Sequence, residues 1–218
     1  EDPISNWLPS YAGKVVADPS FRGRVVPAAR PVTVRHILTH TSGLSLREAD
    51  TPPPRSPLES REAFDRVEGR FPGAPKTLLE TIEQAAGVPL AFQPGEQWQY
   101  GFSTDYVAAL VEKISGLNID QFLRRRLLEP LGMRDTHYNI PEEKVNRVAA
   151  VYWSGAGGKL TLLRKPEYRE PTTYFRGVGG LTTTVLDYFR FAQMLLNGGE
   201  FAGTRVLGRM TVDMMLTN

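Results

Sequence analysis

The chain has 218 residues, 41% of them hydrophobic, which is enough to bury a sizeable core in one domain or in one large lobe of a bigger fold. Lysine and arginine total 26 against 24 for aspartate and glutamate, so the formal charge of +2 argues against partners that need a strong field, such as nucleic acid or anionic lipid. The absence of cysteine excludes disulfides, thiol nucleophiles and cysteine-based zinc sites.

The hydropathy and the first residues narrow the expectations further. No stretch approaches the ~18 consecutive apolar residues that a membrane-spanning helix needs. The first residues, Glu1-Asp2-Pro3, do not resemble a signal peptide, and a first residue other than Met indicates a trimmed chain. We therefore expect a small uncharged substrate and neither a membrane nor a nucleic-acid partner, while the oligomeric state and the compartment, cytoplasmic or periplasmic, stay open.

Two helices are predicted in the first half of the chain, because each segment combines a cap, an apolar period near 3.6 and a stop signal. The first begins at Thr77, which forms a capping box with Glu80, and ends at Gly87. The second follows Ser103-Thr104 and ends at Gly116. The residues predicted to be buried are Leu78, Leu79, Ile82 and Ala86 in the first helix, and Tyr106, Val107, Leu110, Val111 and Ile114 in the second.

Two further helices are predicted in the second half. One starts at Asn118 and must end near Pro130, whose ring clashes with a continuing helix. The other begins at Thr184, paired with Asp187, and stops at Asn197-Gly198-Gly199. The residues predicted to be buried are Ile119, Phe122, Leu123 and Leu127, and then Leu186, Phe189, Ala192 and Leu195 or Leu196.

Little of the remaining chain predicts strands. Two β-leaning runs, Arg147 to Ser154 and Lys159 to Arg164, flank four small residues and predict a hairpin. The proline-rich stretch Thr51–Pro57 predicts a surface loop near a site entrance. Dominant helices with little sheet are typical of the helical lobe of an α+β fold. We therefore expect residues 1–218 to be the central, mainly helical part of a single catalytic domain, truncated at both ends.

Tyr100 lies at the junction between a loop and a capped helix. A residue there is held rigidly, yet it can project its side chain into a cleft, and the free N–H groups at the helix start favour developing negative charge. That position suits a phenol used as a base. The alternative is that Tyr100 and Trp98 are ordinary core aromatics.

The segment Pro94-Gly95-Glu96-Gln97-Trp98-Gln99-Tyr100 resembles the Pro-Gly-x-x-Trp-x-Tyr segment of class C β-lactamases, penicillin-binding proteins and family VIII carboxylesterases. Four other stretches, at 2–9, 34–44, 128–136 and 179–184, are similar to patterns of the same bacterial superfamily. The resemblance covers nearly the whole chain and is weakest from Ser45 to Lys76. It implies an α+β fold of the serine β-lactamase/transpeptidase type, with this chain supplying mostly the helical lobe and part of the active-site cleft.

The resemblance also implies a chemistry. In this superfamily a Ser-x-x-Lys motif supplies the acylated serine and an activating lysine, and the tyrosine of a second motif shuttles protons. The chain contains no Ser-x-x-Lys, which the resemblance places before Glu1, and a third motif is expected after Asn218. Tyr100 is therefore the one catalytic residue that carries over. Its hydroxyl has a reference pKa of about 10 and needs a neighbouring cation, such as that lysine, to act as a base near neutral pH.

Phe102 departs from the pattern of lactam-processing relatives. Those proteins have Asn or Ser two residues after the tyrosine, where a polar side chain contacts the substrate amide. Family VIII esterases accept apolar residues there. The resemblance thus implies that Phe102 contacts the substrate and favours esters over β-lactams, and the alternative is that it packs in the core.

Three other motifs have simpler interpretations. His36 and His40 have the spacing of two zincin ligands on one helical face, but the glutamate base is missing, so capping and packing are favoured and no metal or cofactor is expected. Arg124-Arg125-Arg126 lies inside a helix and indicates a solvated face rather than a nucleic-acid patch. Gly177-Val178-Gly179-Gly180 lacks the context of a phosphate loop and indicates a tight turn.

The function that the resemblance implies is hydrolysis of small carboxylic esters through a seryl acyl-enzyme, by a protein of which this fragment alone is inactive. A β-lactamase or D-alanyl carboxypeptidase is the alternative activity. A catalytically dead relative that acts as a binding module is the alternative class. An upstream Ser-x-x-Lys distinguishes the hydrolases from the dead relative.

Overall fold

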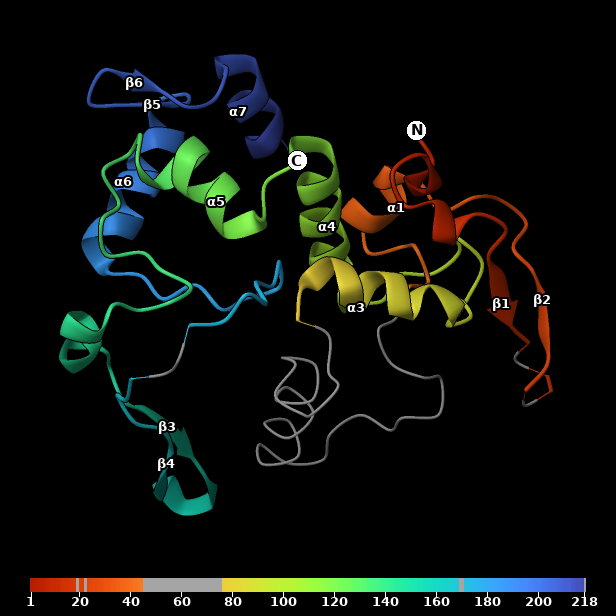
Figure 1. The fold of residues 1–218 in the computed structure, drawn as a ribbon, viewed down its shortest axis with the longest axis horizontal. Helices are drawn as coiled ribbons and strands as arrows, with labels where there is room; N and C mark the ends of the chain where they lie inside the picture. Colours follow the sequence, from red (N-terminus) through yellow and green to blue (C-terminus); the bar gives the residue numbers. More distant parts are fainter. Residues whose placement is uncertain (19, 22, 45–75, 169–170, 218) are drawn as a thin grey trace. The chain divides into compact units, whose positions relative to one another are not determined.

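The computed structural model describes residues 1–18, 20–21, 23–44, 76–168 and 171–217. They fall into two compact units (Figure 1). Unit 1 comprises Glu1–Leu127 and Thr173–Gly180, and unit 2 comprises Leu128–Thr172 and Leu181–Asn218. The predicted proline-rich loop at Thr51–Pro57 lies outside the described residues.

Helix α4 (Ser103–Ser115) is the central element of unit 1. It contacts three other helices, α1 (Val34–Leu38), α3 (Leu78–Gln84) and α5 (Ile119–Leu123). Its buried face includes Tyr106 and Leu110, as predicted, together with two small residues that let neighbouring helices approach, Ala108 and Ala109. Gly116 ends the helix in the left-handed conformation, with φ of 70°.

The local start and stop signals of unit 1 are confirmed. Thr77 caps α3 and forms the predicted capping box with Glu80, and the helix tightens into η3 (Ala85–Gly87), where Ala85 rather than Ala86 is buried. Asn118 caps α5, which continues as the π-helix η4 (Arg124–Leu128) and so ends before Pro130. Two short 3-10 helices, η1 (Ile4–Asn6) and η2 (Pro9–Tyr11), lie near the start of the chain.

A small hairpin in unit 1 was not predicted. Its strands β1 (Val15–Ala17) and β2 (Val25–Pro27) pair antiparallel, and each is too short for the alternating pattern that reveals a strand. Leu90 extends this pairing, because its N–H donates to the carbonyl of Val15 (2.8 Å) and its carbonyl accepts from the N–H of Ala17 (2.8 Å). The hairpin therefore holds the start of the segment that leads to Tyr100.

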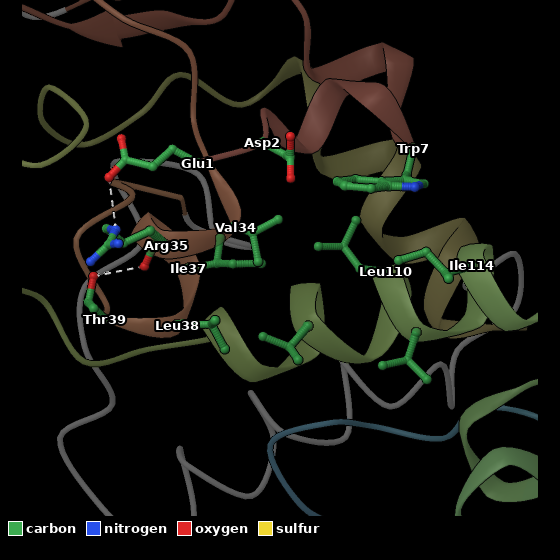
Figure 2. A pocket seen from close by; sticks show the side chains of 12 residues that line it. Glu1, Asp2, Trp7, Val34, Arg35, Ile37, Leu38, Thr39, Leu110 and Ile114 are labelled. Atoms are coloured by element: carbon green, nitrogen blue, oxygen red, sulfur yellow. Dashed lines mark hydrogen bonds and ion pairs between the residues drawn. The ribbon is translucent and has the colours of Figure 1, made fainter. Parts of the chain in front are cut away.

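The prediction that Ile114 is buried is wrong for the described chain, since 63% of this residue is exposed. The reason is a groove of about 700 Å³ beside α1 and α4 (Figure 2). Ile114 faces this groove together with other apolar side chains, including Trp7, Ile37, Leu38, Val107 and Leu110. The apolar period of α4 therefore continues past the face that the described residues cover.

Unit 2 contains the predicted hairpin. Its strands pair antiparallel, but the first begins at Val151 rather than Arg147, because residues 142–147 form a 3-10 helix instead. Helix α6 contacts the strand that follows it. In chain order the elements are η5 (Glu142–Arg147), β3 (Val151–Ser154), η6 (Ala156–Gly158), β4 (Leu160–Arg164), α6 (Val185–Leu196), β5 (Glu200–Phe201), β6 (Thr204–Arg205) and α7 (Arg209–Leu216).

The predicted buried face of α6 is wrong, although its predicted cap at Thr184 is confirmed. Leu186, Phe189, Ala192 and Leu196 are exposed, whereas Asp187 and Met194 are buried. The physical reason is a set of hydrogen bonds: the Asp187 carboxylate accepts from the backbone N–H of Asp135 (2.7 Å) and from the Thr136 hydroxyl (3.0 Å), and this turns the face of Asp187 and Met194 inward. Within the described residues, no helix combines the length and apolar character that a bilayer crossing requires.

Candidate active site

The segment that carries Tyr100 runs beside the short stretch that follows α1. Three backbone hydrogen bonds join the two segments and hold the path of the chain as far as the residue before Tyr100. Helix α4 then begins at Ser103, so Tyr100 lies at the loop-to-helix junction that the sequence predicts. The bonds run from the N–H of Ala91 to the carbonyl of Gly43 (2.9 Å), from Gly95 to Thr41 (2.8 Å) and from Gln99 to His40 (2.9 Å).

A glycine makes this close approach possible. Gly43 has a φ of +73°, and a Cβ at this position would lie 2.5 Å from the carbonyl oxygen of Phe92. Real Cβ atoms do not come so near a backbone oxygen, so a larger residue would push the two segments apart. Gly43 thereby fixes the spacing between the two segments.

Tyr100 does not belong to the core of the described residues. Its residue surface is 75% exposed and that of Trp98 is 67% exposed, whereas Tyr106 on α4 is fully buried. Burial raises the pKa of the Tyr106 hydroxyl to about 12. The two tyrosines thus divide into a core residue and a residue whose hydroxyl is accessible. The catalytic role of Tyr100 remains a prediction.

The imidazole of His40 packs against the Tyr100 ring. The two ring centroids lie 5.0 Å apart with an angle of 30° between the planes, and Trp98 contacts the same imidazole at 6.2 Å. His40 has a φ of +56°, a left-handed conformation that costs a non-glycine residue about 1–3 kcal/mol. Such strain is found most often at functional sites. Sequence reasoning expected a capping or packing role for His40 but could not identify Tyr100, 60 residues away, as the ring it packs against.

The predicted shared helical face of His36 and His40 is wrong. Helix α1 ends at Leu38, and the left-handed turn at His40 takes that side chain off the helix. His36 instead completes a capping box, in which its Nδ1 accepts from the N–H of Thr33 (3.2 Å). Within the described ranges, no group of three or more histidine, cysteine, aspartate or glutamate residues could hold a metal ion. Capping and packing are therefore the roles that the geometry assigns.

Phe102 lies at the N-terminal end of α4, where its carbonyl accepts from the N–H of Asp105 (2.9 Å). Its ring is half-buried, and the guanidinium carbon of Arg176 lies 5.4 Å from the ring centroid, a cation–π geometry. The structure therefore gives Phe102 a partner within the protein. Its predicted contact with substrate stays a prediction.

Asp105 anchors the glycine-rich segment to the start of α4. Its buried carboxylate pairs with the equally buried Arg176 (2.8 Å) and accepts from the N–H groups of Gly177 (2.7 Å) and Val178 (3.1 Å). A Cβ on Gly177 would lie 2.0 Å from the carbonyl oxygen of Thr104, so only glycine fits. The segment bends at residues 177–179, and the Asp105 carboxylate occupies two N–H groups that a phosphate loop would offer to a ligand. Sequence reasoning missed this contact, since an acidic residue in the first turn of a helix usually signals only the helix dipole.

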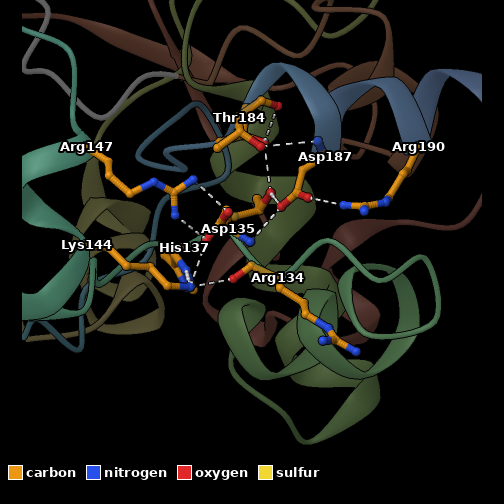
Figure 3. Close-up of polar contacts among 10 residues, drawn as sticks. Arg134, Asp135, His137, Lys144, Arg147, Thr184, Asp187 and Arg190 are labelled. Carbon is orange, nitrogen blue, oxygen red and sulfur yellow. Dashed lines mark hydrogen bonds and ion pairs between the residues drawn. The ribbon is translucent and has the colours of Figure 1, made fainter.

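A second polar cluster lies in unit 2 (Figure 3). Asp135 pairs with Arg147 (2.9 Å) and Lys144 (2.9 Å), whose hydrogen bonds hold the pKa of that carboxyl well below its usual range. Lys144 also contacts Nε2 of His137 at 3.1 Å. These residues tie neighbouring loops of unit 2 together.

The arginine run at 124–126 has the predicted solvated character, with Arg125 and Arg126 exposed.

Protein Rv1367c of Mycobacterium tuberculosis is 30% identical over 220 residues, a match that covers 100% of this chain and 52% of that protein. Esterase EstB of Burkholderia gladioli is 32% identical over 157 residues, covering 70% of this chain and 35% of EstB. The chain therefore spans about half the length, or less, of these curated relatives.

Among solved structures, EstCE1, a hydrolase with promiscuous acyltransferase activity, matches with a TM-score of 0.68 and 22% identity. The match covers 99% of this chain and 55% of EstCE1, and at this identity it shows the fold. The expected serine β-lactamase/transpeptidase-like fold is thereby confirmed. The Beta-lactamase family model matches residues 1–217, so the loop-to-helix junction at Tyr100 and the anchored turn at Gly177 are parts of a known fold: the chain belongs to the β-lactamase family.

Proposed function

We propose that this chain is the central part of a serine hydrolase, and that the full-length protein cleaves small carboxylic esters through a seryl acyl-enzyme. The observation that carries the proposal is the exposed Tyr100, held by backbone hydrogen bonds at the start of α4 in a chain of the β-lactamase family. Esterase EstB, among the relatives, supports esters as the substrate class.

The proposed reaction uses Tyr100 as the proton carrier. A serine hydroxyl attacks the ester carbonyl while the Tyr100 oxygen accepts its proton, and backbone N–H groups stabilise the oxyanion. Collapse of the intermediate expels the alcohol, which takes the proton back from Tyr100. Water then attacks the acyl-enzyme by the same route and releases the acid. A lysine near Tyr100 lowers the pKa of the phenol so that it can act near neutral pH.

The serine and the lysine are proposed to lie outside residues 1–218, on a helix of the full-length protein that packs into the groove beside α1 and α4. That groove is lined mostly by apolar side chains, and its residues Thr39 and Val107 are close in sequence to His40 and Tyr100 (Figure 2). If the helix is there, Ile114→Lys lowers the unfolding midpoint of the full-length protein. A neutral Ile114→Lys substitution would show that this groove stays open to solvent.

The first test is the nucleophile. The gene of the full-length protein is expected to encode Ser-x-x-Lys, and a fluorophosphonate probe is expected to label that serine and to lose its target when the serine is changed to Ala. A full-length protein with neither the motif nor labelling would instead favour a binding module. Residues 1–218 alone are expected not to turn over p-nitrophenyl esters.

The second test is substrate class. We expect kcat/KM for p-nitrophenyl butyrate to exceed that for nitrocefin by about one to two decades, since a lactam's buried acylamino group would find an apolar Phe102 and an unpaired polar group costs about 1–3 kcal/mol. Phe102→Asn should narrow the gap, and Phe102→Leu is the matched control that keeps the site apolar. Nitrocefin turnover equal to ester turnover would favour a β-lactamase.

A further inference from the structure

We infer that His40 is the positioning residue for Tyr100, with its imidazole setting the direction of the phenol ring and its carbonyl fixing the segment that carries it. The inference deepens the proposed function and rests on it, because the direction of the ring matters only if the Tyr100 hydroxyl moves a proton. His40 itself has no proposed contact with substrate.

Two contacts from His40 act on the same short segment. Its carbonyl accepts from the backbone N–H of Gln99 (2.9 Å), and its ring lies 5.0 Å from the Tyr100 ring at an angle of 30°, within the range of offset aromatic stacking. Trp98, two residues before Tyr100, also lies near the imidazole, with ring centroids 6.2 Å apart and an angle of 58° between the planes. His40 therefore holds both the backbone and two side chains of the segment.

Tyr100 depends on such a neighbour because it is so exposed. Among the described residues 75% of its surface is open, so few atoms besides those of His40 restrict its ring, and a freely turning phenol would place its hydroxyl correctly only part of the time. Proton transfer requires the two heavy atoms to lie within about 2.6–3.2 Å of each other. Packing against His40 restricts the orientation of the phenol ring. The hydroxyl of Tyr100 therefore lies within reach of the serine for a larger fraction of the time.

The energetic cost of having histidine at position 40 also supports a positioning role. Its backbone is left-handed, a conformation that glycine adopts at no steric cost. Its Nδ1 is buried without a hydrogen-bond partner among the residues that the structure describes. A smaller residue would avoid both penalties, and what it would lose is the ring that contacts Tyr100 and Trp98.

The experiment compares His40→Asn with His40→Tyr in the full-length protein, assayed with p-nitrophenyl butyrate. Asparagine accepts the left-handed backbone but has no ring, so kcat should fall by about 10- to 100-fold, the cost of misplacing a catalytic group by about 1 Å, with KM nearly unchanged. Tyrosine restores an aromatic ring and should keep kcat within about threefold of the wild type. A loss in His40→Tyr as large as in His40→Asn would contradict the inference.

A double-mutant cycle separates positioning from general structural damage. In a Tyr100→Phe background, His40→Asn should cause no further loss of kcat, because the hydroxyl that His40 positions is gone. An equal further loss there would show that His40 acts elsewhere. If His40→Asn fails to fold at the assay temperature, His40→Gly, which also accepts the left-handed backbone and has no ring, replaces it in the same cycle with Tyr100→Phe.

The two proposals fail in different ways. A Tyr100→Phe enzyme with normal kcat overturns the proposed function and this inference together. A Tyr100→Phe enzyme with greatly reduced kcat, beside a His40→Asn enzyme with normal kcat, overturns the inference alone.

Discussion

Asp105 in unit 1 and Asp187 in unit 2 have the same structural role in two regions of the molecule. Each lies in the first turn of a helix, each is buried, and each turns its carboxylate inward to accept a backbone N–H from a distant part of the chain. They differ in the paired arginine. Arg176 lies 71 residues from Asp105, and its side chain is 4% exposed, whereas Arg190 follows Asp187 by one helical turn and its side chain is 37% exposed.

The difference separates a long-range anchor from a local one. The Asp105 pair is closed off from water, so neither charge can be hydrated if the other is removed. In the Asp187 pair the arginine keeps contact with solvent and can be hydrated alone. The turn at Gly177 next to the start of α4 is therefore fixed more strongly than the loop that α6 holds. Urea unfolding of the full-length protein and its variants measures that ranking.

The largest effect is expected for Asp105→Ala. Removing the carboxylate takes away the buried ion pair of Arg176 and the acceptor of two backbone N–H groups, those of Gly177 and Val178. Breaking a buried pair in this way costs about 3–5 kcal/mol, which urea unfolding measures as a lower midpoint. Glu200→Ala is the control, because its exposed pair with Arg205 should contribute less than about 1 kcal/mol. A similar cost for both variants would remove the distinction between the two kinds of pair.

Asp187→Ala should cost less, about 1–3 kcal/mol. The variant leaves the N–H of Asp135 and the hydroxyl of Thr136 without one acceptor, but the Thr136 hydroxyl also contacts Thr183 (2.8 Å) and Arg190 reaches water. The comparison of the two urea midpoints ranks the anchors directly. A cost equal to that of Asp105→Ala would mean that burial of the arginine does not decide the strength of the anchor.

Glu112→Gln, on α4, should give the smallest effect and one of opposite sign. Glu112 is buried and accepts from the N–H of Ile119 (2.8 Å), but among the described residues no cation pairs with it. Burial raises the pKa of its carboxyl, although the Ile119 N–H opposes the shift. Since the folded pKa lies above the unfolded one, the charged form destabilises the fold at pH 7 and this penalty disappears as the pH falls below about 4.

The glutamine variant keeps an acceptor for Ile119 and carries no charge. Its urea midpoint should therefore exceed that of the wild type at pH 7, with the advantage shrinking as the pH is lowered through the glutamate's raised pKa. A lower midpoint at pH 7 would show that the carboxylate has a stabilising partner and belongs with Asp105 and Asp187.

The sequence correctly predicted the features that depend on residues close together in the chain. The caps at Thr77, Asn118 and Thr184 depend on side chains within three residues, and all three are confirmed. The buried face of α6 depended instead on Asp135 and Thr136, some 50 residues away, and was predicted wrongly.

In the candidate site, too, local features were predicted and long-range contacts were not. The motif around Tyr100 is contiguous, so its place before α4 could be predicted. The contact with His40 spans 60 residues and depends on a left-handed residue that carries no compositional signal, and the partner of Asp105 lies 71 residues along the chain. Long-range contacts of single side chains leave no periodic pattern, and for that reason they came only from the structure.

The central claim, that Tyr100 carries the proton, is tested most directly by Tyr100→Phe in the full-length protein. This change removes the hydroxyl and keeps the ring beside His40, so the unfolding midpoint should not move. We expect kcat for p-nitrophenyl butyrate to fall by about 100- to 10,000-fold, while Tyr188→Phe, which alters another exposed tyrosine, leaves kcat unchanged. A kcat for Tyr100→Phe close to that of the wild type would contradict the account and reduce Tyr100 to an exposed aromatic residue.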